Sequence, residues 1–301
     1  MGHLLSVKDF CKLHIIFHYA AVLLKDLMAE TQIYPVGAVG DDLPAEELFT
    51  MMKNTGMNMN YVKTIPNTPT LHSICFQYPD QSGGNITESQ SASSLVSAEM
   101  IFEAETILSK NKCMVLSVPE VPLSSRLELI GLGYKYQSYV LASFVSEEIE
   151  TIRKQQVLEK INLLAVNLDE AAALANVPLN NSVRDIVEGC INVAIKFNPD
   201  IRLCITCGDQ GIYGYDHGEL EFIPVINVPV RNTAGAGDAV LSGIITGLIL
   251  GFPFIGNERR SCIKLGRLIG AMSVTSEDTI NFGINLKSLK RFQKIHGEEI
   301  V

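Results

Sequence analysis

The stretch VPVRNTAGAGDAVLSGIITGLILG, residues 228–251, joins a loop of small residues to a long apolar run. The loop carries a single carboxylate, Asp238, directly before a segment that contains no charged residue. Three interpretations compete for this stretch: a membrane helix, a buried packing helix, or a helix whose amino end belongs to a catalytic site. The composition and the rest of the chain help to decide among them.

The composition is that of a folded, acidic protein. Hydrophobic residues make up 47% of the 301 positions and charged residues 19%, which supplies enough apolar surface for a large core. The formal net charge of −9 argues against a nucleic-acid partner, because phosphate contact needs a basic face. The seven cysteines are scattered and odd in number, which favours a reducing, cytoplasmic location over a disulfide framework.

Strand-like and helix-like runs alternate along the chain. The predicted strands are 32–39, 113–118, 138–144, 161–166 and 201–208, and the predicted helices include 44–56, 146–160 and 184–196. Apolar strands that alternate with helices predict an α/β fold with a parallel sheet covered on both faces. Residues 70–78 and those following 79–84 are instead typical of a hairpin, which we interpret as a small flap beside the main sheet.

The membrane interpretation fails on length. Residues 239–256 carry no charge, and Gly243, Gly247 and Gly251 have the spacing found where membrane helices pack. Pro253 should nevertheless end the helix after about fourteen residues, or roughly 21 Å, against a hydrocarbon core of about 30 Å. No membrane partner is therefore expected, and the glycines fit a helix packed tightly on a sheet.

The loop before the apolar run has the chemistry of an anion site. A helix amino terminus presents unpaired N–H groups and a partial positive charge, and in TAGAGD the amides of Ala234 to Gly237 can point into one concavity. Asp238 beside such a site could receive a proton from a hydroxyl that attacks phosphorus, a step that asks little of its base. Asp is also a preferred helix cap, so the loop alone leaves both roles open.

The loop NTAGAGDAV, residues 232–240, resembles the D-T-x-G-A-G-D-x-F signature of the ribokinase/PfkB carbohydrate kinase family. Further segments that resemble family motifs occur in the family's order: VGAVGDD (36–42), TPTLHSICFQYPDQSGGNIT (68–87), PEVP (119–122), NLDE (167–170) and ITCGDQG (205–211). The resemblance covers roughly residues 20 to 295. It implies a three-layer α/β sandwich with a mostly parallel sheet, formed by residues 1–301 as a single domain, with a reduced β lid that includes a hairpin at about 66–90.

The resemblance implies phosphoryl transfer from ATP to a hydroxyl of a sugar or nucleoside-like molecule, with ATP and Mg²⁺ as cofactors. Asp238 resembles the catalytic base, which also contacts the substrate. The other matched positions are Gly235, Ala236 and Gly237 for the anion hole, Asn167, Glu170, Thr206, Gly208, Gly211 and Thr233 for the nucleotide, and Glu120 and Asn85 for the substrate. Asn167 and Glu170 resemble the pair that organises Mg²⁺; without the downstream loop they would be interpreted as ordinary helix caps.

The chain departs from the family at its start. Tyr19 stands where the family has an Asn that grips the sugar, and His14 and Ile15 stand where it has glycines. The family's first strand and two lid strands have no counterpart in the sequence. The alternative interpretation is therefore an N-terminally truncated or catalytically impaired homologue that binds nucleotide without efficient turnover. An exposed lid strand could pair between subunits, so a homodimer through the lid is possible.

A second departure is Asn232, where the family has an Asp that contributes to a monovalent-cation site. The segment TSEDT, residues 275–279, also lacks the glycine expected nearby. Loss of a carboxylate weakens cation binding, which makes potassium activation doubtful.

Overall fold

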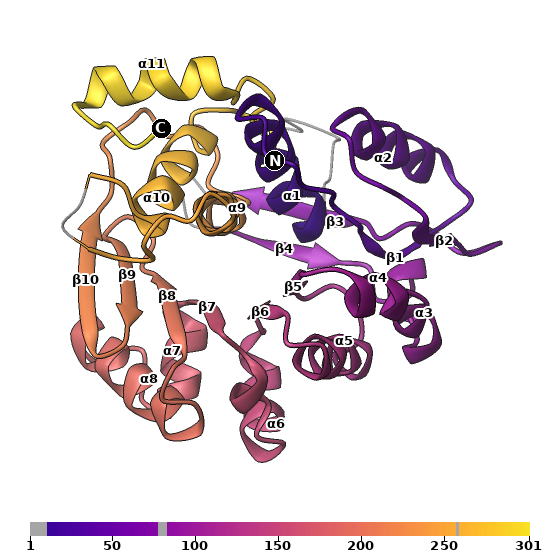
Figure 1. Ribbon diagram of the computed structural model, residues 1–301, viewed down its shortest axis with the longest axis horizontal. Helices are drawn as coiled ribbons and strands as arrows, with labels where there is room; N and C mark the ends of the chain where they lie inside the picture. Colours follow the sequence, from indigo (N-terminus) through magenta and orange to yellow (C-terminus); the bar gives the residue numbers. More distant parts are fainter. Residues whose placement is uncertain (1–10, 78–82, 257–258) are drawn as a thin grey trace.

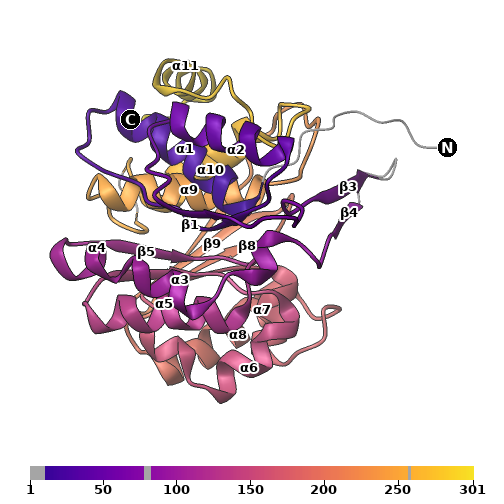
Figure 2. The same cartoon turned by 90° about the vertical axis from the view of Figure 1, so that its right-hand side faces the viewer.

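The structure is a computed structural model that describes residues 11–77, 83–256 and 259–301. Helices cover both faces of a central layer of strands, so the predicted α/β fold with three layers is confirmed (Figures 1 and 2). The carboxyl ends of the parallel strands define the edge at which an α/β protein builds its site.

The main sheet has the strand order β10-β9-β8-β7-β6-β5. Its parallel part consists of β5 (Met114–Ser117), β6 (Tyr139–Ala142), β7 (Leu163–Asn167) and β8 (Arg202–Thr206), which are the four strands predicted after residue 100. The sheet continues into two antiparallel strands that were not predicted, β9 (Gly211–Asp216) and β10 (Glu219–Pro224).

Two smaller sheets lie beside the main one. β1 (Val36–Val39), within the predicted strand at 32–39, pairs in parallel with β2 (Tyr61–Thr64). β3 (Ser73–Gln77) pairs antiparallel with β4 (Gly83–Thr87), which confirms the predicted hairpin; its turn lies outside the described residues. Figure 2 shows this hairpin extending from the body of the molecule, and Ile74 and Ile86 on it are exposed.

The helices form the two outer layers. One layer contains α3 (Ala98–Glu103), α4 (Glu105–Lys110), α5 (Leu123–Lys135), α6 (Ile149–Lys154), α7 (Leu168–Ala175) and α8 (Val183–Phe197), and the other contains α1 (Lys12–Asp26), α2 (Leu43–Asn54), α9 (Ala236–Ile249), α10 (Cys262–Ser273) and α11 (Leu286–His296). The predicted helices at 44–56 and 184–196 correspond to α2 and α8. The predicted helix at 146–160 is instead broken into α6 and two short 3₁₀ turns.

The apolar run that opened the sequence is α9, and it is buried on every side from Ala239 to Gly247. It packs against α1, α10 and the main sheet (Figure 1). Gly243 and Gly247 serve a helix–helix contact and not the helix–sheet contact that we expected: a β-carbon at Gly243 would lie 2.6 Å from Gly266 Cα of α10, and one at Gly247 would lie 3.0 Å from Cys262 Cα. Gly251 lies beyond the end of α9, and a β-carbon there would meet nothing within 4 Å. No helix among the residues that the structure describes is long and apolar enough to cross a membrane.

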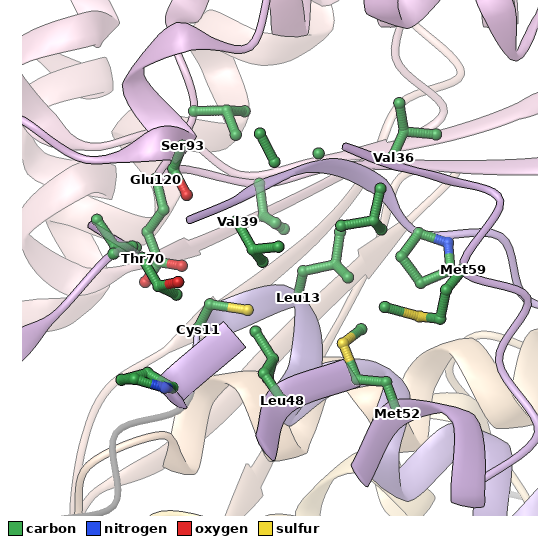
Figure 3. Close-up of a pocket in the computed structure, with 18 of the residues that line it drawn as sticks. Cys11, Leu13, Val36, Val39, Leu48, Met52, Met59, Thr70, Ser93 and Glu120 are labelled. Atoms are coloured by element: carbon green, nitrogen blue, oxygen red, sulfur yellow. The ribbon is translucent and has the colours of Figure 1, made fainter. Parts of the chain in front are cut away.

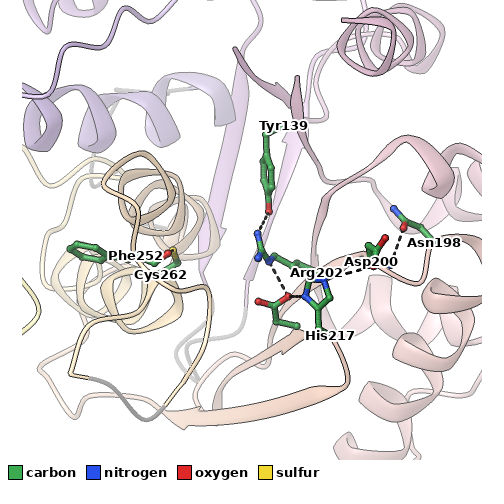
Figure 4. A network of polar contacts seen from close by, with 8 residues as sticks. Tyr139, Asn198, Asp200, Arg202, His217, Phe252 and Cys262 are labelled. Carbon is green, nitrogen blue, oxygen red and sulfur yellow. Dashed lines mark hydrogen bonds and ion pairs between the residues drawn. The ribbon is translucent and has the colours of Figure 1, made fainter. Parts of the chain in front are cut away.

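A polar network ties the sheet together at the edge opposite the site (Figure 4). Arg202, the first residue of β8, donates from Nε to Asp216 Oδ1 at 3.0 Å and from Nη1 to Tyr139 Oη at 3.1 Å. His217 contacts Asp216 and Asp200 in turn. The amino ends of β6 and β8 and the end of β9 are thereby held together, which fixes the sheet from the side where no site residue was predicted.

Candidate active site

The carboxyl ends of β7 and β8 bring two predicted nucleotide residues together. Asn167 and Thr206, the last residues of these strands, are direct partners in the parallel ladder. The turn after Thr206 is closed by a hydrogen bond from Cys207 N to Gly211 O at 2.8 Å. Gly211 has φ 138°, and a β-carbon there would lie 2.2 Å from Ile223 O, so only glycine fits. A β-carbon at Gly208, in the same turn, would meet nothing within 4 Å, so the turn is open at that position.

Asn167 and Glu170 cap α7 reciprocally. Glu170 N donates to Asn167 Oδ1 at 2.8 Å, and Asn167 N donates to Glu170 Oε2 at 2.9 Å. This reciprocal pair is a capping box, as expected if the two residues serve as ordinary helix caps. It also fixes one oxygen of each side chain at the sheet edge. Burial raises the pKa of Glu170 to about 7, and the backbone hydrogen bond and Lys12 oppose that rise. Carboxylate and amide oxygens are hard ligands that suit Mg²⁺.

The glycine loop before α9 turns sharply at Gly235, which has φ 75° and caps the helix. A β-carbon at Gly235 would lie 3.0 Å from Thr279 Cγ2 and 3.3 Å from Ile15 Cδ1, so these two side chains pack closely against the loop. Two of the expected anion-binding amides are already used: Ala234 N donates to Asn232 Oδ1, and Ala236 N donates to Thr233 O.

The amides that remain for an anion belong to Gly235, Gly237 and Asp238. In the described part of the chain none of these three N–H groups makes a hydrogen bond. The helix macrodipole adds a partial positive charge at the same place. The loop can thus offer three donors to an anion, in a slightly different set from the one that the sequence suggested.

Asp238 lies in the first turn of α9 with 16% of its side chain exposed. Burial raises the pKa of its carboxyl, and the ammonium of Lys12 lowers it. Lys12 Nζ lies 3.9 Å from Asp238 Oδ2. Lys12 is the first residue of α1, and sequence reasoning missed it, because it precedes the part of the chain that resembles a known motif.

Glu120 follows β5 in the left-handed region with φ 90°, which is strained for a residue with a side chain. Its Oε2 accepts a hydrogen bond from Lys12 N at 2.9 Å. The other predicted substrate residue, Asn85, lies in β4, paired with Cys75, and its side chain lies outside what the structure describes. Lys12 therefore connects Glu120 with Asp238.

A cavity of about 710 Å³ opens beside Glu120, between β1 and the segment that follows β5. Most of its lining is apolar, as Figure 3 shows for Leu13, Val39 and Met52. Cys11 and Glu120 also face it, whereas Asp238 and the glycine loop do not line it. The cavity thus adjoins the polar centre and shares Glu120 with it.

The three bulky residues that we matched to sugar-binding positions from the sequence are buried. His14 and Tyr19 are fully buried and Ile15 is 4% exposed. Tyr19 Oη accepts a hydrogen bond from Asn281 N at 2.8 Å, and Ile15 supports Gly235. Ile15 and Tyr19 thereby pack α1 against α9 and the 275–284 segment.

Asn232 joins two loops next to the anion site. Its Nδ2 donates to Glu277 O at 2.9 Å, while its Oδ1 accepts from Ala234 N at 2.9 Å. Its backbone N also donates to Val274 O at 3.3 Å. An amide N–H of Asn232 therefore faces the carbonyl oxygen of Glu277.

The fold and this site define a class, namely α/β proteins with a glycine loop next to a carboxylate at the amino end of a buried helix. The chain belongs to the pfkB family of carbohydrate kinases, whose family model matches residues 20–285. It is 24% identical over 265 residues to a ribokinase of Schizosaccharomyces pombe, covering 86% of this chain and 81% of the relative.

Solved structures agree on the fold. A protein described as a ribokinase II from E. coli, in complex with ATP and Mg²⁺, superimposes with a TM-score of 0.75 at 15% identity, over 98% of this chain and 94% of that one. A nucleoside kinase of Burkholderia thailandensis in complex with inosine gives 0.73 at 16% identity, over 96% and 88%. The predicted ribokinase-like fold is therefore confirmed.

Proposed function

We propose that this chain transfers the γ-phosphoryl group of ATP to a hydroxyl of a sugar or nucleoside. The observation that carries the proposal is the position of Asp238: a partly buried carboxylate at the amino end of α9, next to three N–H groups with no hydrogen-bond partner among the described residues. Phosphoryl transfer needs such donors for the transferred group and a weak base for the attacking hydroxyl.

The nucleotide would lie over the carboxyl ends of β7 and β8. Thr206, Gly208 and Gly211 form an open backbone turn there, and Thr233 lies at the start of the glycine loop. The family membership and the related structure that holds ATP support this placement.

Asn167 and Glu170 would hold Mg²⁺ together with the phosphates and water. The fit rests on their chemistry: both present oxygen atoms at one sheet edge, and Mg²⁺ in phosphoryl-transfer sites takes only one or two protein oxygens. When bound, the ion neutralises charge that builds up on the phosphate oxygens. The base role of Asp238 does not depend on that ion.

The acceptor hydroxyl would approach from the side of Glu120. Glu120 lines the cavity, and Lys12 joins it to the centre that holds Asp238. A carboxylate is suited to accept hydrogen bonds from the other hydroxyls of a sugar ring. Asp238 would then take the proton of the attacking hydroxyl as the new bond to phosphorus forms.

The test is ADP release with MgATP over a panel of pentoses, hexoses and nucleosides. Acceptor-dependent ADP release, together with mass-spectrometric detection of a phosphorylated acceptor, is the expected result. ATP binding without ADP release on any acceptor would overturn the proposal in favour of the impaired homologue.

A further inference from the structure

Lys12 occupies a position where three structural elements meet. It is the first residue of α1, and its neighbour Cys11 makes no side-chain hydrogen bond that caps the helix. The cap comes from another element, because Glu120 Oε2, after β5, accepts the hydrogen bond of Lys12 N. The side chain of Lys12 extends to a third element, α9, where Nζ lies 3.9 Å from Asp238 Oδ2.

Among the described residues, the charged groups that act on this lysine are all negative. Asp238, Glu120 and Glu170 each raise the pKa of Lys12, and together they outweigh the lowering that burial causes. The lysine therefore stays an ammonium ion in the pH range in which proteins work. Its side chain keeps 38% of its surface exposed, so the ammonium remains within reach of a bound ligand.

Asp238 depends on this ammonium more than on any other group. The titratable groups that interact with it are Lys12 and Tyr19 from α1 and Glu170 from α7. Glu170 is an acid, and Tyr19 is neutral because burial raises its pKa to about 12. Lys12 alone among the three supplies positive charge that favours the ionised carboxylate.

We propose that Lys12 is a positioning residue of the phosphoryl-transfer site, which fixes the Asp238 carboxylate through its ammonium and Glu120 through its backbone N–H. This inference rests on the proposed function, since it concerns the base of the same reaction. One residue thereby sets the distance between the base for the attacking hydroxyl and the carboxylate that faces the acceptor.

The geometry also gives the lysine a balancing role. A phosphoryl group that enters next to Asp238 and Glu170 meets negative charge on two sides. An ammonium between these acids offsets that repulsion, in a region where burial weakens the screening by water. A point charge on a flexible stem can follow the group as it moves, which an arginine does less well.

The experiment compares Lys12→Met and Lys12→Arg with the parent chain. Lys25→Met, an exposed lysine in the last turn of the same helix, is the matched control. We expect Lys12→Met to lower kcat about 10-fold, as loss of roughly 1.4 kcal/mol would. The acid limb of the pH–rate profile of Lys12→Met should move to higher pH, since Asp238 loses the positive charge that lowers its pKa. Lys12→Arg should recover most of the rate, and Lys25→Met should equal the parent.

A second readout does not need turnover. Carboxyl ¹³C NMR of aspartate-labelled protein, with Asp238→Asn to assign the resonance, follows the ionisation of Asp238 without substrate. A higher pKa of Asp238 in Lys12→Met than in the parent supports the inference even if no acceptor is turned over, in which case only the proposed function fails. An unchanged Asp238 pKa in Lys12→Met, or a rate equal to that of Lys25→Met in an active enzyme, would overturn it.

Discussion

The contact between α9 and α10 is tight enough to make a single methyl group measurable. In Gly243→Ala the new β-carbon would lie 2.6 Å from Gly266 Cα and 2.7 Å from Leu265 O. Both partners are backbone atoms, so the helices must separate by roughly 1 Å to reach ordinary contact distance. Such overpacking costs about 1–3 kcal/mol, and the better helix propensity of alanine returns at most about 1 kcal/mol. Because both partners are backbone atoms, the cost should lie near the upper end of that range, which leaves a net loss of about 2 kcal/mol.

Gly131→Ala is the matched control, because Gly131 also lies inside a helix, α5, and a β-carbon there meets nothing within 4 Å. It should gain about 0.5–1 kcal/mol. Thermal unfolding monitored by circular dichroism should place Gly243→Ala about 4–8 °C below the parent and Gly131→Ala slightly above it. Equal melting temperatures for the two variants would refute the assignment of Gly243 to a close contact between α9 and α10.

Two further predictions concern pH and potassium. Burial lowers the pKa of His14 to about 3 and of His18 to about 4, both below the value of 6.5 in an unfolded chain. The unfolded state therefore binds more protons below pH 6.5, and stability should fall from there toward pH 4, by on the order of 2 kcal/mol per histidine at pH 5. His18→Phe should flatten that fall in urea titrations at several pH values; a slope equal to the parent's would count against it. Asn232→Asp should make activity respond to KCl at constant ionic strength, because an oxygen replaces the N–H that now faces Glu277 O. The parent should be indifferent to potassium, and activation of the parent would contradict this account.

The local geometry of the proposed nucleotide side of the site could be predicted from the sequence because each of its motifs is local. The loop at 232–238, Asn167 with Glu170, and the glycines after β8 each form a short turn whose conformation depends on neighbouring residues. Asn167 and the turn after β8 then lie side by side, because β7 and β8 end at the same edge of the sheet. The fold class, which the structure confirms, could be predicted for a similar reason, since an apolar run in the sequence directly indicates a buried strand.

The rest depends on contacts between distant segments. Lys12 meets Asp238 across 226 positions in the chain, and no pattern around residue 12 indicates that encounter. The packing of α10 against Gly243 and Gly247 was also not predicted, because the glycine spacing indicates a close contact but does not identify the element that makes it. β9 and β10 escaped prediction since their glycines and charged residues weaken the apolar signal that marked the central strands.

The central claim is that Asp238 is the base for the attacking hydroxyl. The most direct test is Asp238→Asn, with single-turnover phosphoryl transfer measured beside ATP affinity by calorimetry. We predict a loss of about 10²–10⁴ in rate, the usual contribution of a general base, with ATP affinity close to that of the parent. A rate within a few-fold of the parent's would contradict the account.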